Sequence, residues 1–413
     1  MVRRDSAENL NDKSGGVPDK CLGFPNYFQD DSICSGILQG WNLDCSPAGF
    51  LFTLSLEMLS TLRVLDFRCF GGLSLEVPPA GAILTGRNAQ GKTSVLEAVC
   101  MLVRLHSPRT SRMATLARVG GNGGFGVAGE AWDMERRLQW EPRRPSRFQV
   151  AGDERKTQGE YLQDGGLLVW MGNEDLGLVR GGGEGRRRYL DFIGSQVDMG
   201  YRRALHRYRR ALKAKNFLLK ETRPREAEII SYESIMIDAA EILHKVRAEL
   251  VQKLAPAAAR YQVEMAGREE LLEIQYENAG GKDMAGALEQ ARERERRQRR
   301  SLVGPHRDEV HIRVNGLDAA AFASEGQQRT VAIALKLAQG DVLAASCDCQ
   351  PLWLIDDVFG ELDVSRRNAL MQALPANAQK WITTTHLDWL AADSPLGDLA
   401  RFDVVNGSVR GWK

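Results

Sequence analysis

Residues 86–93 read Gly-Arg-Asn-Ala-Gln-Gly-Lys-Thr, which is the pattern of a phosphate-binding loop. The glycines let backbone N–H groups turn towards phosphate oxygens, Lys92 can reach the terminal phosphates, and Thr93 can ligate Mg²⁺. A strand pattern at 82–85 precedes the loop and a helical pattern at 94–105 follows it, which disfavours the alternative of a fortuitous glycine turn. The sequence therefore predicts a binding site for a nucleoside triphosphate.

A later segment has carboxylates in the position that such a site needs. The apolar run Leu352–Ile355 ends in Asp356 and Asp357. A carboxylate at the end of a buried strand is the second protein group that holds the metal ion in phosphate-loop enzymes. We therefore expect this segment to lie beside the phosphate loop.

A third motif, Ser324-Glu325-Gly326-Gln327, opens a helical pattern at 327–343. The Ser hydroxyl, the backbone N–H groups of Gly326 and Gln327 and the positive end of the helix can all face one anion. The alternative is an ordinary Ser-capped helix, which requires no ligand. The order of this motif relative to the other two favours anion recognition.

Alternating and helical patterns predict the elements that must position these motifs. Early strands are expected at 61–67, 73–77, 82–85, 125–132, 138–140 and 148–150. Later strands are expected at 310–314, 352–355, 381–385 and 402–405, the last in a hairpin that turns at Asn406-Gly407. Helices are expected at 186–220, with a long basic run, and at 227–259, 284–300 and 327–343.

This order predicts an α/β fold with a nucleotide-binding lobe built from both ends of the chain. We expect lobe I to comprise 58–165 and 350–413, and a mainly helical lobe II, which contains Ser324, to comprise 166–349. Residues 1–57 have no sustained period and a net charge of −4, from four Lys/Arg and eight Asp/Glu. They are expected to be a disordered extension, or a segment upstream of a true start at Met58.

Composition excludes several classes of protein. No stretch of 18 apolar residues and no signal peptide is present, so we expect a cytoplasmic protein without a membrane span. The seven cysteines are odd in number and irregularly spaced, which argues against a disulfide framework. Cys347-Asp-Cys349 has no second pair with zinc spacing, so a loop is favoured over a metal site. No heptad run of coiled-coil length occurs.

One segment is strongly basic. Residues 201–215 contain seven Lys/Arg and no Asp or Glu, whereas a merely solvated helix favours mixed signs. This density suits contacts with DNA phosphates, and the alternative is pairing with acidic neighbours such as Glu226 and Glu228. The residues expected to contact DNA are Arg202, Arg203, Arg207, Arg209, Arg210 and Lys213. For the arginines of 292–300, local ion pairs are an equal alternative.

Taken together, the three motifs resemble those of ATP-binding-cassette (ABC) ATPases. From Met58 to the C-terminus the chain is similar to the RecF family of bacterial DNA replication and repair proteins, related to the heads of Rad50 and SMC proteins. The segments that carry this resemblance are Leu65–Arg68, Asn88–Thr93, Arg187–Asp191, Gly304–Asp308, Gly326–Thr330 and Asp356–Asp363.

The resemblance implies roles for individual residues. ATP would be bound by Gly86, Arg87, Asn88, Ala89, Gln90, Gly91, Lys92, Thr93 and Ser94, and Mg²⁺ by Thr93 and Asp356. Asp357 would orient or deprotonate the attacking water, and His386 would sense the γ-phosphate. Ser324, Gly326 and Gln327 would contact the γ-phosphate held by a second copy of the chain. Glu361–Asp363 would lie at the dimer seam.

It also implies the biological setting. The expected protein is a weak, DNA-stimulated ATPase that closes as an ATP-dependent homodimer on duplex DNA near single-strand gaps. It would act with RecO and RecR to support RecA loading in repair and replication. Because an Asp base is one methylene shorter than a Glu, slow turnover is expected, which suits a timed clamp.

Three features depart from the family pattern. Glu325 places a negative charge where a neutral Gln is more usual, beside the expected γ-phosphate. Gly360 stands where Ser is common, and the order His106-Ser107-Pro108-Arg109 is unusual, so these four residues are given no role.

Other functions compete with this interpretation. A RecF-like paralogue in defence or chromosome maintenance is the main alternative. A transport ATPase is disfavoured because 232 residues separate Lys92 from Ser324, and a Rad50-like structural protein is excluded by the missing heptads.

Overall fold

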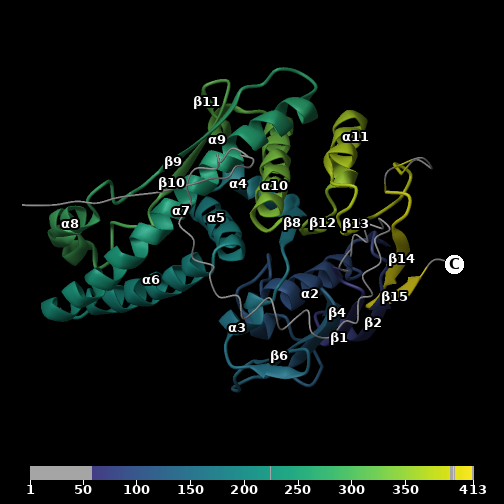
Figure 1. Ribbon diagram of the computed structural model, residues 1–413, viewed down its shortest axis with the longest axis horizontal. Helices are drawn as coiled ribbons and strands as arrows, with labels where there is room; N and C mark the ends of the chain where they lie inside the picture. Colours follow the sequence, from purple (N-terminus) through teal and green to yellow (C-terminus); the bar gives the residue numbers. More distant parts are fainter. Residues whose placement is uncertain (1–57, 224, 391–393, 395, 412–413) are drawn as a thin grey trace, which may run out of the picture. The chain divides into compact units, whose positions relative to one another are not determined.

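The computed structural model describes residues 58–223, 225–390, 394 and 396–411. The predicted extension at 1–57 lies outside the described residues. Two six-stranded sheets and a long helical segment make up most of the described chain (Figure 1).

One sheet brings both ends of the described chain together. Its strand order is β15-β14-β3-β13-β12-β8, and all neighbours are parallel except the terminal hairpin. The bounds are β3 (Gly81–Thr85), β8 (Leu168–Gly172), β12 (Leu352–Asp356), β13 (Lys380–Thr384), β14 (Ala400–Val405) and β15 (Ser408–Gly411). Strands β3, β8, β12 and β13 are mostly apolar and almost wholly buried, as expected for a parallel sheet covered on both faces.

The hairpin between β14 and β15 turns where the sequence predicted. Asn406 and Gly407 both have positive φ, 48° and 70°, as a two-residue turn of type I′ requires.

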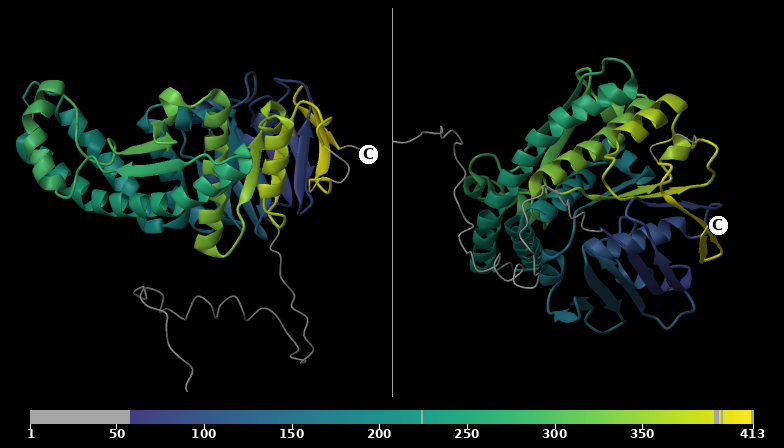
Figure 2. Two further views of the ribbon diagram at one scale, coloured as in Figure 1. Left: turned by 90° about the horizontal axis from the view of Figure 1, so that it is seen from above. Right: turned by 45° about the vertical axis from the view of Figure 1, so that its right-hand side comes forward.

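The second sheet is antiparallel, with the order β2-β1-β4-β5-β6-β7. Its strands are β1 (Thr61–Phe67), β2 (Phe70–Glu76), β4 (Phe125–Ala131), β5 (Met134–Trp140), β6 (Arg147–Val150) and β7 (Asp153–Arg155). Helix α2 (Lys92–Arg104) packs between the two sheets and contacts strands of both (Figure 1, Figure 2). All its residues except Thr93 are buried, so α2 has little freedom to shift.

The middle of the chain is mainly helical, as predicted. Its long helices are α5 (Gly183–Val197), α6 (Met199–Leu218), α7 (Glu226–Ala266), α8 (Met284–Gln298) and α10 (Glu325–Cys347). A three-stranded sheet contains β9 (Leu272–Glu277), β10 (Glu309–Val314) and β11 (Leu317–Asp318). Shorter elements are α3 (Gln158–Gln163), α4 (Leu176–Arg180), α9 (Ala319–Phe322), α11 (Val364–Ala373) and the 3₁₀ turns 113–115, 173–175 and 359–361.

The predicted helix at 186–220 is two helices. Asp198 interrupts it with an extended backbone, and its side chain accepts hydrogen bonds from the N–H groups of Gly200 and Tyr201 at the start of α6. An Asp in this position caps a new helix more readily than it continues an old one. Helices α6 and α7 then lie side by side (Figure 2).

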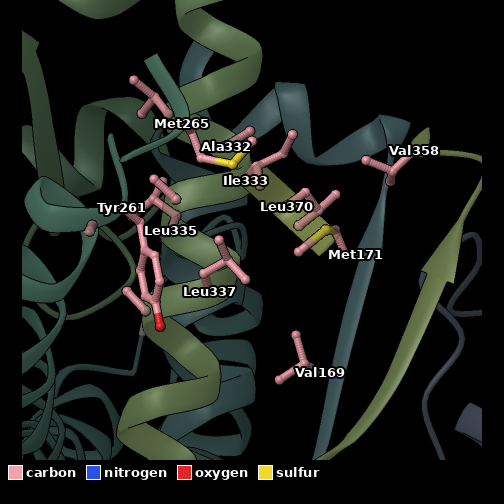
Figure 3. Close-up of a cluster of buried hydrophobic side chains, with 14 of the residues drawn as sticks. Val169, Met171, Tyr261, Met265, Ala332, Ile333, Leu335, Leu337, Val358 and Leu370 are labelled. Atoms are coloured by element: carbon pink, nitrogen blue, oxygen red, sulfur yellow. The ribbon is translucent and has the colours of Figure 1, made fainter. Parts of the chain in front are cut away.

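Helix α10 is the centre of the largest hydrophobic cluster. Figure 3 shows Ala332, Ile333, Leu335 and Leu337 on α10 among apolar side chains of β8 and α7. The helix is long and apolar enough to cross a membrane by composition, but most of it is buried inside the protein. Its apolar character is therefore explained by its place in the core.

One strand of the parallel sheet was not predicted, and neither were β7, β9 and β11 of the other two sheets. Residues 168–172 form β8, which pairs with β12 at the edge of the nucleotide-binding sheet. The sheet thus takes a strand from the segment assigned to lobe II. The division into two lobes, with its boundary at 165/166, stays a prediction.

Candidate functional site

The phosphate loop connects β3 to α2 in a conformation that needs its glycines. Gly86 and Gly91 have positive φ, and Lys92 begins the helix directly after Gly91. A Cβ atom on Gly86 would lie 2.4 Å from the carbonyl oxygen of Val404, and one on Gly91 would lie 2.6 Å from Sγ of Cys69. Backbone N–H groups at a helix start, held in this way, form an anion site.

Lys92 is buried with its ammonium group over this loop. Its Nζ donates to the carbonyl oxygens of Gly86, at 2.6 Å, and Arg87, at 3.1 Å. Burial lowers the pKa of Lys92, and the nearby carboxylates of Asp357 and Asp356 oppose that shift. The ammonium group is therefore held on the loop, where a bound phosphate would meet it.

Asp356 ends β12 and meets two threonine hydroxyls. Oγ1 of Thr93 donates to its Oδ1 at 2.9 Å, and Oγ1 of Thr383 on β13 donates to the same oxygen at 2.7 Å. Burial raises the pKa of Asp356, while these two hydrogen bonds favour the charged form. The three side chains come from α2, β12 and β13 and meet at the carboxyl edge of the parallel sheet.

The donor set of this cluster fits Mg²⁺. A threonine hydroxyl and a carboxylate are hard oxygen ligands, and Mg²⁺ takes one or two protein oxygens together with waters and phosphate oxygens. Among the described residues there is no group of three His, Cys, Asp or Glu side chains that could hold an ion by themselves. Thr93 and Asp356 would therefore hold Mg²⁺ as it arrives with a triphosphate.

Asp357 has an unusual backbone. Its φ is 55°, and its N–H donates to Oγ1 of Thr383 at 2.9 Å. Burial raises the pKa of Asp357, the charge of Lys92 lowers it, Glu361 raises it and His386 lowers it. The strained backbone of Asp357 holds its carboxylate beside the phosphate loop, which is the arrangement expected of a group that orients a water molecule.

His386 follows β13 in an exposed turn. Oγ1 of Thr384 donates to its carbonyl oxygen at 2.9 Å, and its Nδ1 lies 3.7 Å from Oδ2 of Asp388. Its charge lowers the pKa of Asp357, and both residues follow the paired ends of β12 and β13, where Asp356 lies opposite Thr383. The structure brings together the phosphate loop, Asp356, Asp357 and His386 at one edge of the sheet.

The serine motif lies elsewhere in the same chain. Oγ of Ser324 accepts from the N–H of Gln327 at 3.3 Å, and Oε1 of Gln327 accepts from the N–H of Ser324 at 2.9 Å. This capping box starts α10. Nε2 of Gln327 also donates to Glu270 at 3.0 Å. Within the described chain, no hydrogen bond or ion pair joins Ser324, Gly326 or Gln327 to residues 86–94.

Two contributors to the site were missed by sequence reasoning. Glu174 follows β8, and its negative charge raises the pKa of Asp356, while Nε1 of Trp170 donates to its carboxylate at 2.5 Å. The N–H of Asn406 donates to Oε1 of Gln90 at 2.7 Å, so the terminal hairpin supports the loop. The signal for Glu174 was its place after a short apolar run, which was not recognised as a strand.

The segment Leu65–Arg68 and the unassigned residues near 106 hold α2 in place. Glu97, wholly buried in α2, accepts from Nε and Nη2 of Arg68 at 2.7 Å each. Oγ of Ser107 donates to the same carboxylate at 2.5 Å, and Arg109 lies 3.7 Å away. These contacts fix the helix that carries Lys92 and Thr93.

The six basic residues predicted to contact DNA differ in their surroundings on α6. Arg209 lies 2.9 Å from Asp191, Arg207 lies 3.9 Å from Asp238, and Arg202 is half-buried against Met199. Arg203, Arg210 and Lys213 are exposed, and no described carboxylate lies within ion-pair distance of them. At 100° per residue, these three project within about 80° of one another.

Other basic residues of this region form ion pairs with carboxylates of the same chain. Lys215 is fully buried between Glu233, at 2.9 Å, and Glu295, at 2.6 Å. Arg186 pairs with Glu309, and Arg296 pairs with Glu226 and Glu293. Glu226 thus pairs with the arginines of α8 and not with α6, and the local-ion-pair alternative holds for Arg292 and Arg296.

Comparison with known proteins identifies the relatives of the chain. No family model matches it. It is 36% identical over 367 residues to the DNA replication and repair protein RecF of Symbiobacterium thermophilum, covering 85% of this chain and 97% of that protein. It is 35% identical over 350 residues to RecF of Gloeobacter violaceus, covering 80% of this chain and 92% of that protein. Identity to RecF of Shouchella clausii is 31% over 373 residues, with 86% and 99% covered.

Solved structures give the same result. The chain is similar to the recombination mediator protein RecF of the RecFOR pathway bound to ATP, with a TM-score of 0.77 and 26% identity over 88% of this chain and all of that one. The RecF-ATPrS structure has a TM-score of 0.76 and 28% identity, over 86% of this chain and 98% of that one. An Smc head bound to the C-winged helix domain of ScpA, 13% identical with a TM-score of 0.50 over 86% of this chain and 97% of that one, shares the fold. The predicted ABC-ATPase fold is confirmed.

Proposed function

Because the chain belongs to the RecF family of DNA replication and repair proteins, we propose that it is an ATP-dependent recombination mediator that closes as a homodimer on DNA. ATP is its cofactor and the fold is that of an ATPase, as in the two solved structures of RecF-ATP and RecF-ATPrS. The dimeric clamp, its DNA and its partner proteins are the parts of this proposal that go beyond family membership.

One observation supports the dimer above all. The phosphate loop, Asp356 and Asp357 meet within a single chain, whereas the serine motif has its contacts at the start of α10 with Glu270. A triphosphate needs donors on its terminal phosphate as charge develops there. A second copy of the chain would bring its Ser324, Gly326 and Gln327 to that phosphate, and a two-fold dimer would complete both sites at once.

The proposed reaction uses residues with separate tasks. Lys92 and the loop N–H groups would bind and orient the phosphates, and Asp357 would orient the attacking water or accept its proton. Thr93 and Asp356 would hold Mg²⁺, which when bound neutralises charge on the phosphate oxygens. His386, exposed beside Asp357, would donate to the γ-phosphate. Hydrolysis removes the group on which the two copies meet, so the dimer would open.

The proposed ligand of α6 is the phosphate backbone of duplex DNA near a single-strand gap. Arg203, Arg210 and Lys213 would make contacts that depend on charge and not on base sequence. Following the names of the related structures, RecO and RecR are the proposed partners, and support of RecA loading in the cytoplasm is the proposed outcome. DNA is expected to stimulate a weak ATPase, because closure on DNA assembles both sites.

Sedimentation velocity with and without ATP-Mg²⁺ and duplex DNA tests this function. The wild-type chain is expected to shift from monomer to dimer with ATP-Mg²⁺. The Ser324→Arg variant should bind ATP but remain monomeric, because the larger cation blocks the approach of the partner's phosphate loop.

Ser346→Arg is the matched control. Ser346 is exposed near the other end of α10, where its hydroxyl donates to Val342. This variant should dimerise normally. A Ser324→Arg variant that dimerises as the wild type does would refute the assignment of Ser324 to the partner's nucleotide.

A RecF-like paralogue in defence or chromosome maintenance is the alternative function. It shares the nucleotide site and the proposed clamp, and it differs in its partners. Failure to bind RecR or RecO while ATP-dependent closure on DNA is retained would favour this alternative.

A further inference from the structure

Six polar side chains form a continuous series of contacts beside the serine motif. Nδ2 of Asn173 donates to Oε1 of Glu361 at 2.7 Å, and the guanidinium of Arg329 pairs with the other oxygen of Glu361. Arg329 also lies 3.6 Å from Oε1 of Glu325, and Arg180 lies 3.6 Å from its Oε2. Nε of Arg180 donates to Oε1 of Gln328 at 2.5 Å.

Glu325 is the residue in this series whose charge needs an explanation. It directly follows Ser324, at the helix end proposed to receive the partner's γ-phosphate. Its side chain is 66% exposed, so the carboxylate faces the surface that a ligand or a second copy would approach. A carboxylate beside a triphosphate opposes binding, since like charges brought together at an interface repel each other strongly.

Two arginines flank this carboxylate, one from each side. Arg180 comes from the end of α4, and Arg329 comes from the next turn of α10, four residues after Glu325. Arg329 is held in place, because its side chain is only 23% exposed and it is also paired with Glu361. The pair of guanidiniums therefore stays next to Glu325 without any ligand.

We propose that Arg180 and Arg329 are positioning residues that offset the charge of Glu325, so that the serine motif can accept the triphosphate bound by a second copy of the chain. This inference rests on the proposed function. When a triphosphate approaches Ser324, the carboxylate of Glu325 is then accompanied by two guanidiniums and is not an isolated anion.

A competing role for Arg329 is to hold Glu361, which lies four residues after Asp357 and raises the pKa of that carboxyl. The two roles predict different rescues. If Arg329 offsets Glu325, removing the charge of Glu325 restores function to an Arg329 variant. If it only holds Glu361, Glu361→Gln restores function and Glu325→Gln does not.

The experiment is a double-mutant cycle on the full chain, read by ATP-dependent dimerisation in sedimentation velocity. Arg329→Ala should raise the protein concentration for half-dimerisation about 10-fold or more. Arg329→Ala/Glu325→Gln should return to within about 3-fold of Glu325→Gln alone. Arg180→Ala should have a smaller effect, since Arg329 remains, and Glu325→Gln should rescue it too. Arg329→Lys, which keeps the charge, should retain most dimerisation.

The control for folding is the binding of a fluorescent ATP analogue to the monomer. This binding should be unchanged, because the phosphate loop contains none of the substituted residues. The inference is overturned if Arg329→Ala dimerises as the wild type does. It is also overturned if Glu361→Gln rescues Arg329→Ala and Glu325→Gln does not. A wild-type chain that stays monomeric with ATP-Mg²⁺ overturns the proposed function instead.

Discussion

The hydroxyl of Thr93 donates to the carboxylate of Asp356 at 2.9 Å, across a separation of 263 residues in the sequence. This contact joins the phosphate loop to the strand that ends in two carboxylates. It exists because β3 and β12 both pair with β13 in parallel, so their carboxyl ends meet at one edge of the sheet.

Replacement of Lys92 by Ala is expected to abolish ATP binding. The variant loses the ammonium group over the loop carbonyls of Gly86 and Arg87, and with it the charge that meets the terminal phosphates. The affinity for a fluorescent ATP analogue, measured at equilibrium, should fall at least about 100-fold, because a buried charge-assisted contact contributes about 3 kcal/mol of binding free energy. Lys282→Ala, an exposed lysine before α8, should bind as the wild type does.

Asp357→Asn is expected to separate binding from turnover. The amide preserves the shape of the side chain but cannot accept a proton, so ATP binding and dimerisation should persist while hydrolysis falls about 100-fold or more. Phosphate release under single-turnover conditions measures the decrease. Turnover at the wild-type rate would remove Asp357 from the mechanism.

The exposed charges of α6 are expected to set the salt dependence of DNA binding. Arg203→Ala/Arg210→Ala/Lys213→Ala should weaken binding to duplexes of any sequence and reduce the slope of log K against log salt by roughly one for each DNA phosphate that the protein no longer neutralises. Fluorescence anisotropy over a salt series measures this slope. Arg143→Ala/Arg147→Ala/Lys156→Ala removes the same charge from exposed positions near β6 and should leave the slope unchanged.

Lys215, in contrast, is expected to matter for stability. It is fully buried between Glu233 and Glu295, and Lys215→Ala would leave Glu295 without its cation and Glu233 paired with Arg292 alone. Breaking a buried ion pair in this way costs about 3–5 kcal/mol of the free energy of unfolding. Urea unfolding checks the value. Lys213→Ala, two residues away and exposed, should change stability by less than about 0.5 kcal/mol.

His306 is expected to make the protein less stable in mild acid. Its Nδ1 lies 2.6 Å from the Tyr208 hydroxyl, and its Nε2 lies 3.2 Å from the carbonyl oxygen of Ser301, so Nε2 carries the proton of the neutral ring. Burial lowers the pKa of His306 to about 4. Between the ordinary value of about 6.5 and this one, the unfolded chain binds more protons, so stability falls as pH falls.

Thermal unfolding at pH 7 and pH 5 measures this linkage. The difference in Tm between the two pH values should be smaller in His306→Gln than in the wild type. His206→Gln, an exposed histidine on α6, is the control and should keep the wild-type difference. An equal pH response in His306→Gln would show that another group causes the acid sensitivity.

Much of the nucleotide site was predictable, because its parts are locally encoded. The glycines at 86 and 91 are required by positive φ and close contacts, and Asn406-Gly407 forms the predicted turn. Strand β8 was missed because a short apolar run flanked by glycines has no period that distinguishes it from a loop or a buried helix. Without this strand, Glu174 could not be recognised as a neighbour of Asp356.

The sequence by itself determined the phosphate loop, the carboxylate pair, the serine-led helix and the class of fold, since each depends on residues adjacent in the chain. Only the tertiary structure decided which basic side chains of α6 are exposed and can contact a ligand. Lys213 and Lys215 are two residues apart on one helix, yet one is exposed and the other lies between two buried carboxylates. The role of a charge depends on what packs against it, and the two partners of Lys215 come from α7 and α8, which the linear order of residues does not place beside α6.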